Sequence, residues 1–375
     1  MYTRPSLISV NAAIQSYPYK NTMLINFDAG PAALPREVLA QASAAILDYD
    51  NSGLSILEIP HRGKLFEAIL NEANARVKAL LELDDNYEVL WLQGGGRLQF
   101  SMVPMNFLAE DATAGYIESG HWAAEALKNA HLYGHTHVLG SSRADQFTHI
   151  PDWGIVPEDL AYLHLTSNNT IYGTQFFHFP ETKVPLVVDM SSELFSRKLD
   201  YNKFDLIYAV AQKNIGPAGV TLVAVRKSLL EQQKRPLPEI LSYRDGVKHN
   251  SVLNTPPVFA IYCSLLTLRW ISTIGMAEME RRNDEKARLL YEAIDNSKLF
   301  YGVAQKEHRS KMNACFRAYD ELHTQAFLDF ARTRNITGIK GHRSVGGFRA
   351  SLYNAISVAD VQQLVVTMKD YEASL

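Results

Sequence analysis

The sequence is poor in cysteine and has no excess of charge of either sign. Cys263 and Cys315 are the two cysteines in 375 residues, and they lie far apart without the spacing of a metal site. We therefore expect no disulfide framework and a reducing, cytoplasmic location. Lys and Arg together number 37 and Asp and Glu number 40, which gives a formal net charge of −3. This balance provides no basic field for nucleic acid or for an anionic membrane.

Long hydrophobic runs are also absent. No segment reaches the roughly 18 consecutive apolar residues of a membrane span. Residues 1–23 have neither a continuous apolar core nor a clear cleavage site, so we interpret them as an N-terminal extension. A chain of this length suits one large domain and one smaller domain.

Strand-like and helix-like segments alternate through the middle of the chain. Short apolar runs rich in β-branched and aromatic residues are separated by segments with helical spacing, for example TAGYIES followed by HWAAEALKNAHLY. This alternation is typical of an α/β fold with a largely parallel sheet, in which functional groups gather at the carboxyl ends of the strands. Near residue 276 a long charged helix begins, and the mixed strands and helices after it indicate a small α+β domain.

One lysine ends an apolar run in this region. The run from Phe204 to Lys213 is strand-like, and Gly216, Pro217 and Gly219 then force a tight turn before a second strand-like run. Apolar surroundings disfavour the ammonium form and lower the pKa of a lysine, which is the state that Schiff-base chemistry needs. The alternative interpretation of this stretch alone is a surface lysine at a strand end.

Asp189 likewise follows an apolar run, shortly before Lys213 in the sequence. A buried aspartate opposite a Schiff-base lysine can keep the ring nitrogen of pyridoxal phosphate protonated, which makes the ring an electron sink. Three glycines, residues 94–96, precede a helix and let backbone N–H groups approach a phosphate. Trp122 offers an aromatic face on which a ring can stack. Together these four features describe a cofactor site.

Two His-Arg dipeptides, His61-Arg62 and His342-Arg343, are each flanked by glycine, and Arg349 follows the second. An amino acid with a phosphate carries about three negative charges, and guanidinium groups give the strongest charge-assisted contacts to such groups. The alternative is that these arginines lie on solvated faces. The histidines at 131, 135 and 137 have no acidic or cysteine partner nearby in the sequence, so we expect no metal site there.

Several motifs in combination resemble the phosphoserine aminotransferases, which are class-V, fold-type-I enzymes dependent on pyridoxal 5'-phosphate. The similarity runs from about Ile25 to near the end of the chain, and the motifs are NFDAGPAALP, PHRGK, GGGRLQF, AQKNIGPAG, NTPP and KGHRSVGGFRAS. The resemblance implies a large domain, 46–275, built on a mainly parallel seven-stranded sheet, and a small α+β domain, 276–375. It also implies that the N-terminal segment 24–45 packs with the small domain.

The same resemblance implies an activity. The expected reaction is the reversible transfer of an amino group between L-glutamate and 3-phosphohydroxypyruvate, which gives O-phospho-L-serine and 2-oxoglutarate in serine biosynthesis. The related phospho-hydroxythreonine step of pyridoxine synthesis is a second candidate. The expected assembly is a homodimer with shared active sites.

Individual residues take roles from the resemblance. Lys213 holds the cofactor as a Schiff base, and Asp189 pairs with the pyridine nitrogen. Trp122 stacks on the ring, and Thr170 bonds its 3-hydroxyl oxygen. The contacts to the cofactor phosphate are assigned to Gly96, Arg97 and Gln212, joined from the neighbouring subunit by Asn254 and Thr255. The substrate contacts are assigned to Ala29, His61, Arg62, His342, Arg343 and Arg349.

Two positions depart from the family pattern. Ala29 stands where the family often has serine, so a side-chain contact to glutamate is lost while the backbone N–H remains. Ser167, Asn168 and Asn169 precede Thr170 where many members have Pro-Asn-Glu. The threonine is therefore kept in a loop of different composition.

Three alternative functions can be compared with this expectation. A cysteine desulfurase of the same fold normally has histidine just before the lysine and a cysteine on a mobile loop, whereas Gln212 precedes Lys213 here and Cys315 lies in an alternating strand. A transaminase of the serine–glyoxylate type would not need a phosphate clamp. A scaffold that binds the cofactor without turnover would retain the lysine and the aspartate, and the sequence leaves that alternative open.

Overall fold

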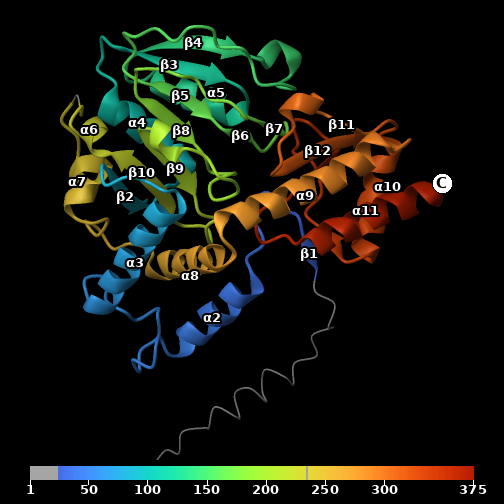
Figure 1. The fold of residues 1–375 in the computed structure, drawn as a ribbon, viewed down its shortest axis with the longest axis horizontal. Helices are drawn as coiled ribbons and strands as arrows, with labels where there is room; N and C mark the ends of the chain where they lie inside the picture. Colours follow the sequence, from blue (N-terminus) through green and yellow to red (C-terminus); the bar gives the residue numbers. More distant parts are fainter. Residues whose placement is uncertain (1–23, 234) are drawn as a thin grey trace, which may run out of the picture.

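A seven-stranded sheet forms the centre of the fold in the computed structural model, which describes residues 24–233 and 235–375 (Figure 1). The extension expected at 1–23 lies outside the described residues. The five strands from β9 to β4 run parallel, and β10 is antiparallel to both of its neighbours. This arrangement confirms the predicted α/β class. In sheet order the strands are β2 (Tyr87–Leu92), β10 (Thr221–Arg226), β9 (Leu206–Val210), β8 (Leu186–Asp189), β5 (Leu163–Thr166), β3 (Thr113–Glu118) and β4 (His135–Ser141).

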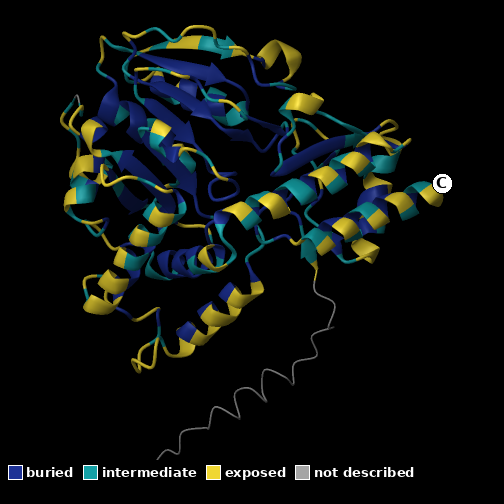
Figure 2. Ribbon diagram, in the orientation of Figure 1, coloured by how far each residue is buried: buried dark blue, intermediate teal, exposed yellow. Residues whose placement is uncertain are grey.

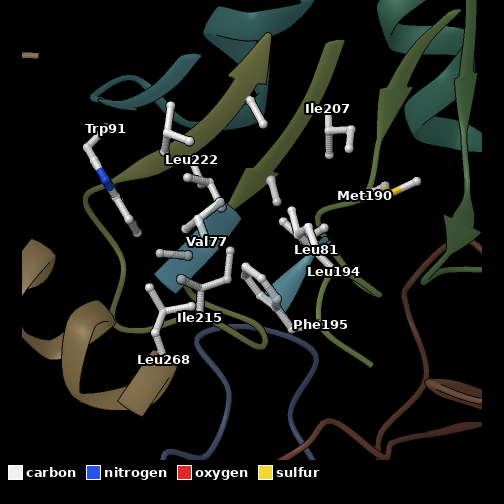
Figure 3. Close-up of a cluster of buried hydrophobic side chains, with 14 of the residues drawn as sticks. Val77, Leu81, Trp91, Met190, Leu194, Phe195, Ile207, Ile215, Leu222 and Leu268 are labelled. Atoms are coloured by element: carbon white, nitrogen blue, oxygen red, sulfur yellow. The ribbon is translucent and has the colours of Figure 1, made fainter. Parts of the chain in front are cut away.

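Helices cover both faces of this sheet, because the central strands are apolar on both sides. Leu186 and Val188 of β8 contribute to one hydrophobic core, and Val187 between them contributes to the other. Figure 3 shows part of the first core, which contains Ile207 and Leu222 of the sheet and Leu268 of a covering helix. The helices of the first face are α3 (Lys64–Leu80) and α8 (Val258–Ile274), and those of the second are α4 (Gly95–Phe107), α5 (His121–Ala130) and α7 (Tyr243–Lys248).

A smaller unit lies at the right of Figure 1. It contains an antiparallel sheet of β11 (Phe300–Gly302), β12 (Asn313–Ala318) and β14 (Phe348–Ser351). A third hydrophobic core lies between this sheet and the helices around it. Those helices are α9 (Met276–Asp295), α10 (Leu322–Thr333) and α11 (Val358–Ala373), the last with a capping box of Ser357 and Asp360.

The segment 24–45 is divided between the two units. Its strand β1 (Ile25–Asn26) pairs with β13 (Ile336–Thr337), and Phe27 lies in the core of the smaller unit. The helix that follows, α2 (Arg36–Leu47), contributes Val38, Ala42 and Ala45 to the core that contains α3 and α8. Residues 25–27 therefore pack with the smaller unit, whereas α2 packs with the large one.

Short elements complete the described chain. The glycine-rich stretch before β14 forms a loop, with one bridge between Lys340 and Phe348. No single helix among the described residues is long and apolar enough to cross a membrane, and α8 and α9 pass that test only as a pair bent by 89°.

Figure 2 shows α8 largely buried and α9 and α11 exposed along their outer faces. The remaining elements are β6 (Asn168–Asn169), β7 (Thr174–Gln175), α6 (Lys227–Leu230) and the 3-10 turns Arg143–Asp145, Tyr201–Lys203, Glu239–Leu241 and Lys306–His308.

Candidate active site

A cavity of about 320 Å³ lies at the carboxyl ends of β5, β8 and β9. These strands supply Thr166, Asp189 and Val210 to its wall, and the N-terminus of α4 supplies residues 94–97. This is the edge at which parallel α/β sheets bind ligands. The cavity therefore lies where the sequence predicts the site.

Lys213 reaches this cavity from a tight turn after β9. The carbonyl of Ala211 accepts hydrogen bonds from the backbone N–H groups of Lys213, at 2.7 Å, and of Gly216, at 2.8 Å. Ile215 points into the hydrophobic core beside Leu268, as Figure 3 shows. The turn that presents the lysine is thus fixed both by hydrogen bonds and by packing.

Gly216 packs directly against helix α8. A Cβ added at this glycine would lie 2.5 Å from Ser264 Oγ, which is too close for any side chain. A Cβ at this position would also lie 3.2 Å from Ser264 Cα, so a side chain here would displace Ser264 or the turn that carries Lys213.

The electrostatic surroundings of Lys213 favour a neutral amine. The pKa of Lys213 is lowered to about 8. Desolvation is the main cause, the charge of Arg349 acts in the same direction, and the Asp189 carboxylate opposes both. A lysine with such a pKa is partly neutral at physiological pH and can accept a proton or attack a carbonyl.

Asp189 is buried at the end of β8, with 5% of its surface exposed. Its Oδ1 accepts a hydrogen bond of 2.9 Å from the N–H of Ser191. Burial raises the pKa of Asp189, while the charge of Lys213 lowers it. The carboxyl is therefore poised to pair with a cationic or N–H-bearing group that enters the cavity.

The N-terminus of α4 offers free backbone donors to the cavity. Its N-cap, Gly94, has φ +88° and supplies no side-chain cap, and Gly95 follows with φ +66°. Both conformations favour glycine. The first N–H groups of a helix have no partner within the helix, so they and the helix dipole attract an anion such as phosphate.

Trp122 lines the opposite wall at the start of α5. Its Nε1–H donates to Thr170 Oγ1 over 3.2 Å, and this contact fixes the indole ring. The structure thus brings together the residues predicted for stacking and for the 3-hydroxyl contact. Arg97 lies with its guanidinium 5.7 Å from the Trp122 ring centroid, and it forms an exposed ion pair of 3.0 Å with Glu125.

Arg349 and His342 approach the mouth of the cavity from the smaller unit. Arg349 Nη1 donates to the carbonyl of Thr170 over 3.1 Å, while its buried Nε has no acceptor among the described residues. The ring centroid of His342 lies 6.5 Å from that of His121, the residue before Trp122. Burial lowers the pKa of His342, and the positive charge of Arg349 adds to this effect. The positive charge at this rim therefore comes from Arg349 and from Arg343, which also lowers the pKa of His342.

The loop before α2 lies beside the lysine. A Cβ added at Gly30 would lie 3.7 Å from Lys213 Cγ, and the carbonyl of Ala29 accepts a hydrogen bond of 3.0 Å from the hydroxyl of Tyr353. Gln212 lines the cavity next to Lys213, and its carbonyl accepts a hydrogen bond from Ala32 N. The Ala29 backbone is thus held close to the site, as the sequence predicts.

Nine of the expected residues do not line this cavity. Thr170, Ala29, His342, Arg343 and Arg349 belong to the elements around it, and the other four are His61, Arg62, Asn254 and Thr255. His61 and Arg62 lie just before α3 and are not among the residues that line the cavity. Asn254 and Thr255 are exposed, and Asn254 Nδ2 donates to Gln93 Oε1 over 2.9 Å. Within one chain these two pairs are separate from Lys213.

Several residues of the cavity were not singled out in the sequence. Thr166, Asn168 and Ser192 line it, and Thr166 is buried with an Oγ1 that has no partner among the described residues. Asn168 Nδ2 donates to Ser192 Oγ over 2.7 Å, so the loop of unusual composition is held by hydrogen bonds. Thr166 ends β5 in register with Asp189, and this pairing between two strands leaves no local signal in the sequence.

These features fit pyridoxal phosphate. The uncapped amides of α4 suit its phosphate, the indole of Trp122 suits its ring, and Asp189 suits its pyridine nitrogen. The unpaired hydroxyl of Thr166 leaves a buried polar atom for a ligand to satisfy. No group of three or more His, Cys, Asp or Glu side chains that could hold a metal ion occurs among the described residues.

Comparison with known proteins gives consistent matches over nearly the whole chain. Residues 24–364 match the family model described as aminotransferase class-V. The phosphoserine aminotransferase of Flavobacterium johnsoniae is 49% identical over 93% of this chain and 99% of its own length. The solved phosphoserine aminotransferase of Bacillus circulans subsp. alkalophilus is 47% identical and superposes with a TM-score of 0.91, over 94% of this chain and 99% of that one.

A third relative bears on the cofactor. The phosphoserine aminotransferase of Trichomonas vaginalis, solved with pyridoxal phosphate bound, is 38% identical with a TM-score of 0.88 over 92% of this chain and 99% of that one. Its fold and cofactor agree with the cavity described above. The chain therefore belongs to the class-V aminotransferases, a family of enzymes that use pyridoxal phosphate.

Proposed function

We propose that this enzyme transfers an amino group between L-glutamate and 3-phosphohydroxypyruvate, giving 2-oxoglutarate and O-phospho-L-serine. The observation that carries this proposal is the group of Arg349, Arg343 and His342, in which both arginine charges lower the pKa of the histidine. The charge of Arg349 also lowers the pKa of Lys213, in the cavity that contains Asp189. The names of the relatives support the same substrates. The structurally related phospho-hydroxythreonine is the second candidate substrate, because the same groups would bind its phosphate and carboxylate.

The chain's own residues divide the chemistry among them. Bound pyridoxal phosphate supplies an electron sink for the pair of electrons left when the substrate loses its α-proton. Lys213 Nζ, with its pKa lowered to about 8, accepts that proton and returns one. Asp189 would pair with the pyridine nitrogen and favour its protonated form, and Trp122 and Thr170, which are joined by a hydrogen bond, would contact the ring.

The rim explains the choice of substrate. Arg349 is expected to bind the α-carboxylate that both amino acids share, through the Nε that has no partner among the described residues. Arg343 and His342 would meet the group at the other end of the substrate. The guanidinium of Arg343 suits a phosphate better than a hydroxyl, because it can form charge-assisted hydrogen bonds, and the ring of His342 can donate a further hydrogen bond.

A homodimer would complete this site. His61, Arg62, Asn254 and Thr255 have the types expected for phosphate recognition, yet they lie outside their own cavity. Leu57 and Leu47 near the first pair are 62% and 67% exposed, which suits a surface covered by a second copy. We therefore propose that a second copy supplies these four residues to the cavity. Mixed dimers of Lys213→Ala and Thr255→Ala subunits should recover some complete sites and hence some activity, whereas active monomers in sedimentation would contradict this assembly.

Competing assignments receive less support from the site. Cys315 is buried on β12, and burial raises the pKa of its thiol to about 12, which does not suit the reactive thiolate of a desulfurase. Both cysteines, Cys263 and Cys315, are free and buried, which is consistent with the cytoplasmic location that we propose.

A half-reaction titration tests the function. The enzyme loaded with pyridoxal phosphate is mixed with L-glutamate, O-phospho-L-serine or L-serine, and the absorbance of the cofactor is followed. We expect rapid conversion to the amine form with the first two and very slow conversion with serine. Equal rates for serine and phosphoserine would overturn the phosphate assignment, and no conversion with any of the three would indicate a cofactor-binding scaffold without turnover.

A further inference from the structure

The segment that follows Arg349 contacts the surroundings of Lys213 at two points. At the first, the backbone N–H of Asn354 donates to Asn214 Oδ1 over 3.0 Å. At the second, the hydroxyl of Tyr353 donates to the carbonyl of Ala29 over 3.0 Å. Asn214 is the residue after the lysine, and Ala29 belongs to the loop that packs on the lysine side chain. Residues 353 and 354 of the smaller unit thus contact both the residue that follows Lys213 and the loop that lies beside its side chain.

This segment is itself firmly held. The buried Lys286 Nζ donates to the carbonyls of Leu352, at 2.7 Å, and Tyr353, at 2.9 Å. Asn313 Nδ2 donates to the Tyr353 hydroxyl over 3.2 Å. Asn354 Nδ2 donates to the carbonyl of Phe195 over 2.9 Å, on the side of the large unit. Residues 351–354 form the end of β14 and the chain that follows it. The hydrogen bonds that hold them therefore also restrict the position of Arg349 in β14.

We propose that Asn214 is a positioning residue for amino transfer, which sets the distance between Lys213 and the carboxylate held by Arg349. Lys213 belongs to the turn after β9 and Arg349 to β14, so no element of secondary structure joins the two. The Asn214 side chain provides the most direct link, since it is adjacent to the lysine and bonds the end of the segment that starts at Arg349. This inference rests on the proposed function, because it assumes that Arg349 binds the substrate carboxylate.

The geometry of Asn214 also defines a matched pair of variants. Its Oδ1 accepts from Asn354 N, whereas its buried Nδ2 has no acceptor among the described residues. Asn214→Ala removes the acceptor, and Asn214→Asp keeps it without losing any hydrogen bond seen here. Asn106→Ala is the control for general destabilisation, since Asn106 is equally buried and donates to two backbone carbonyls far from residues 351–354.

The test measures binding and reaction separately in the holoenzyme. The rate of the glutamate half-reaction at saturation gives the chemical step. The dissociation constant of α-methylglutamate, which has no α-proton to lose, gives binding. Asn214→Ala should slow the saturated rate by on the order of ten- to a hundredfold, because a small misplacement of a reacting group has a cost of this size. The dissociation constant should change little, because the variant leaves Arg349 in the smaller unit and Lys213 in the large unit intact.

Three further measurements decide between positioning and mere stability. Asn214→Asp should recover most of the rate lost in the alanine variant, and Tyr353→Phe should show the same separation of rate from binding, to a smaller extent. Amide hydrogen exchange in the peptide that contains Asn354 should be faster in Asn214→Ala than in wild type or Asn106→Ala.

Two outcomes would overturn the inference. One is an Asn214→Ala variant that is less stable, like Asn106→Ala, but reacts with glutamate at the wild-type rate. The other is an Asn214→Asp variant as slow as the alanine variant. A wild-type enzyme that does not react with glutamate would instead refute the proposed function, so the two failures are distinguishable.

Discussion

The floor of the cavity and its rim are built in different ways. The floor consists of Lys213 and Asp189 at the ends of buried strands, where hydrogen bonds and packing fix each group. The rim consists of Arg343, which is exposed, and His342 and Arg349, which are half-buried, on a glycine-rich loop and the strand after it. The floor is complete within one chain, whereas the groups at the rim have room for further partners.

This difference assigns different tasks to the two regions. A buried, rigid floor suits steps that every substrate shares, because low solvent exposure strengthens electrostatic effects and shifts pKa values. An exposed rim of permanent charges suits recognition, since charged contacts discriminate between substrates that carry different groups. Changes to the floor should therefore affect all substrates, and changes to the rim should affect one substrate more than another.

The strongest test of this division is Lys213→Ala. The loss of proton transfer by this residue should slow both half-reactions by about 10²–10⁴-fold from that step alone, and more with the loss of the Schiff base. Single-turnover absorbance measurements with glutamate and with phosphoserine would check the result. A variant that keeps the normal rate with either substrate would contradict the role of Lys213 in the floor.

Asp189→Asn should have the next largest effect. The amide keeps the shape of the carboxyl group but cannot hold the proton on the pyridine nitrogen, so the rate should fall on the order of 10²–10³-fold while the cofactor still binds. Cofactor content by absorbance and the rate of each half-reaction are the measurements. Unchanged rates would show that the electron-sink role does not depend on Asp189.

The rim should respond selectively. Arg343→Ala should cost the phosphoserine half-reaction about 1.5–3 kcal/mol, the usual value of one charge-assisted contact, and should affect glutamate less. Arg349→Ala should impair both substrates, because both carry an α-carboxylate. The ratio of kcat/KM for the two substrates is the quantity to compare, and an equal loss with both in Arg343→Ala would remove the distinction between floor and rim.

The smallest expected effect concerns the stability of the fold and depends on a second buried lysine, Lys286. Burial lowers the pKa of Lys286 to about 7 from an ordinary value of 10.5, although its ammonium donates to two carbonyls. Between these values the unfolded chain binds more protons than the folded one, so stability should rise as pH increases from about 7, by at most about 1.4 kcal/mol per pH unit. Urea unfolding of the wild type at several pH values would measure this slope.

Two lysine variants sharpen that measurement. Lys286→Met should flatten the rise of stability with pH, whereas Lys183→Met should not, because Lys183 lies in an exposed ion pair with Glu158. An identical slope in the wild type and in Lys286→Met would place the pH dependence elsewhere in the molecule.

The sequence was most informative where local pattern and chemistry coincide. The apolar runs that end at Asp189 and Lys213 predicted two strand ends, and the structure has β8 and β9 there. The glycines at 94–96 likewise predicted the start of α4. In each case the residues that form the strand end or the helix start also make up the sequence pattern that predicts it.

Other features depend on contacts between distant residues and left no local pattern. The pairing of Ile25 with Ile336 joins two-residue strands from opposite ends of the described chain. The loop that carries His342 and Arg343 contains alternating residues that resemble a strand pair, yet its glycines fold it back through a hydrogen bond from Gly341 N to the carbonyl of Gly347. The contribution of Thr166 to the cavity was missed because its neighbour in register, Asp189, lies on another strand.

The close packing of Gly216 on α8 has a consequence for how this gene can vary. Gly216 touches no reacting group, yet any side chain at this position would collide with Ser264 and displace the turn that carries Lys213. In a saturation mutagenesis screen selected for growth without serine, position 216 should thus tolerate almost no replacement. Exposed rim positions such as Arg343 should instead accept changes that trade one substrate for another. Selection on this enzyme would then be strict at a residue that takes no part in its chemistry.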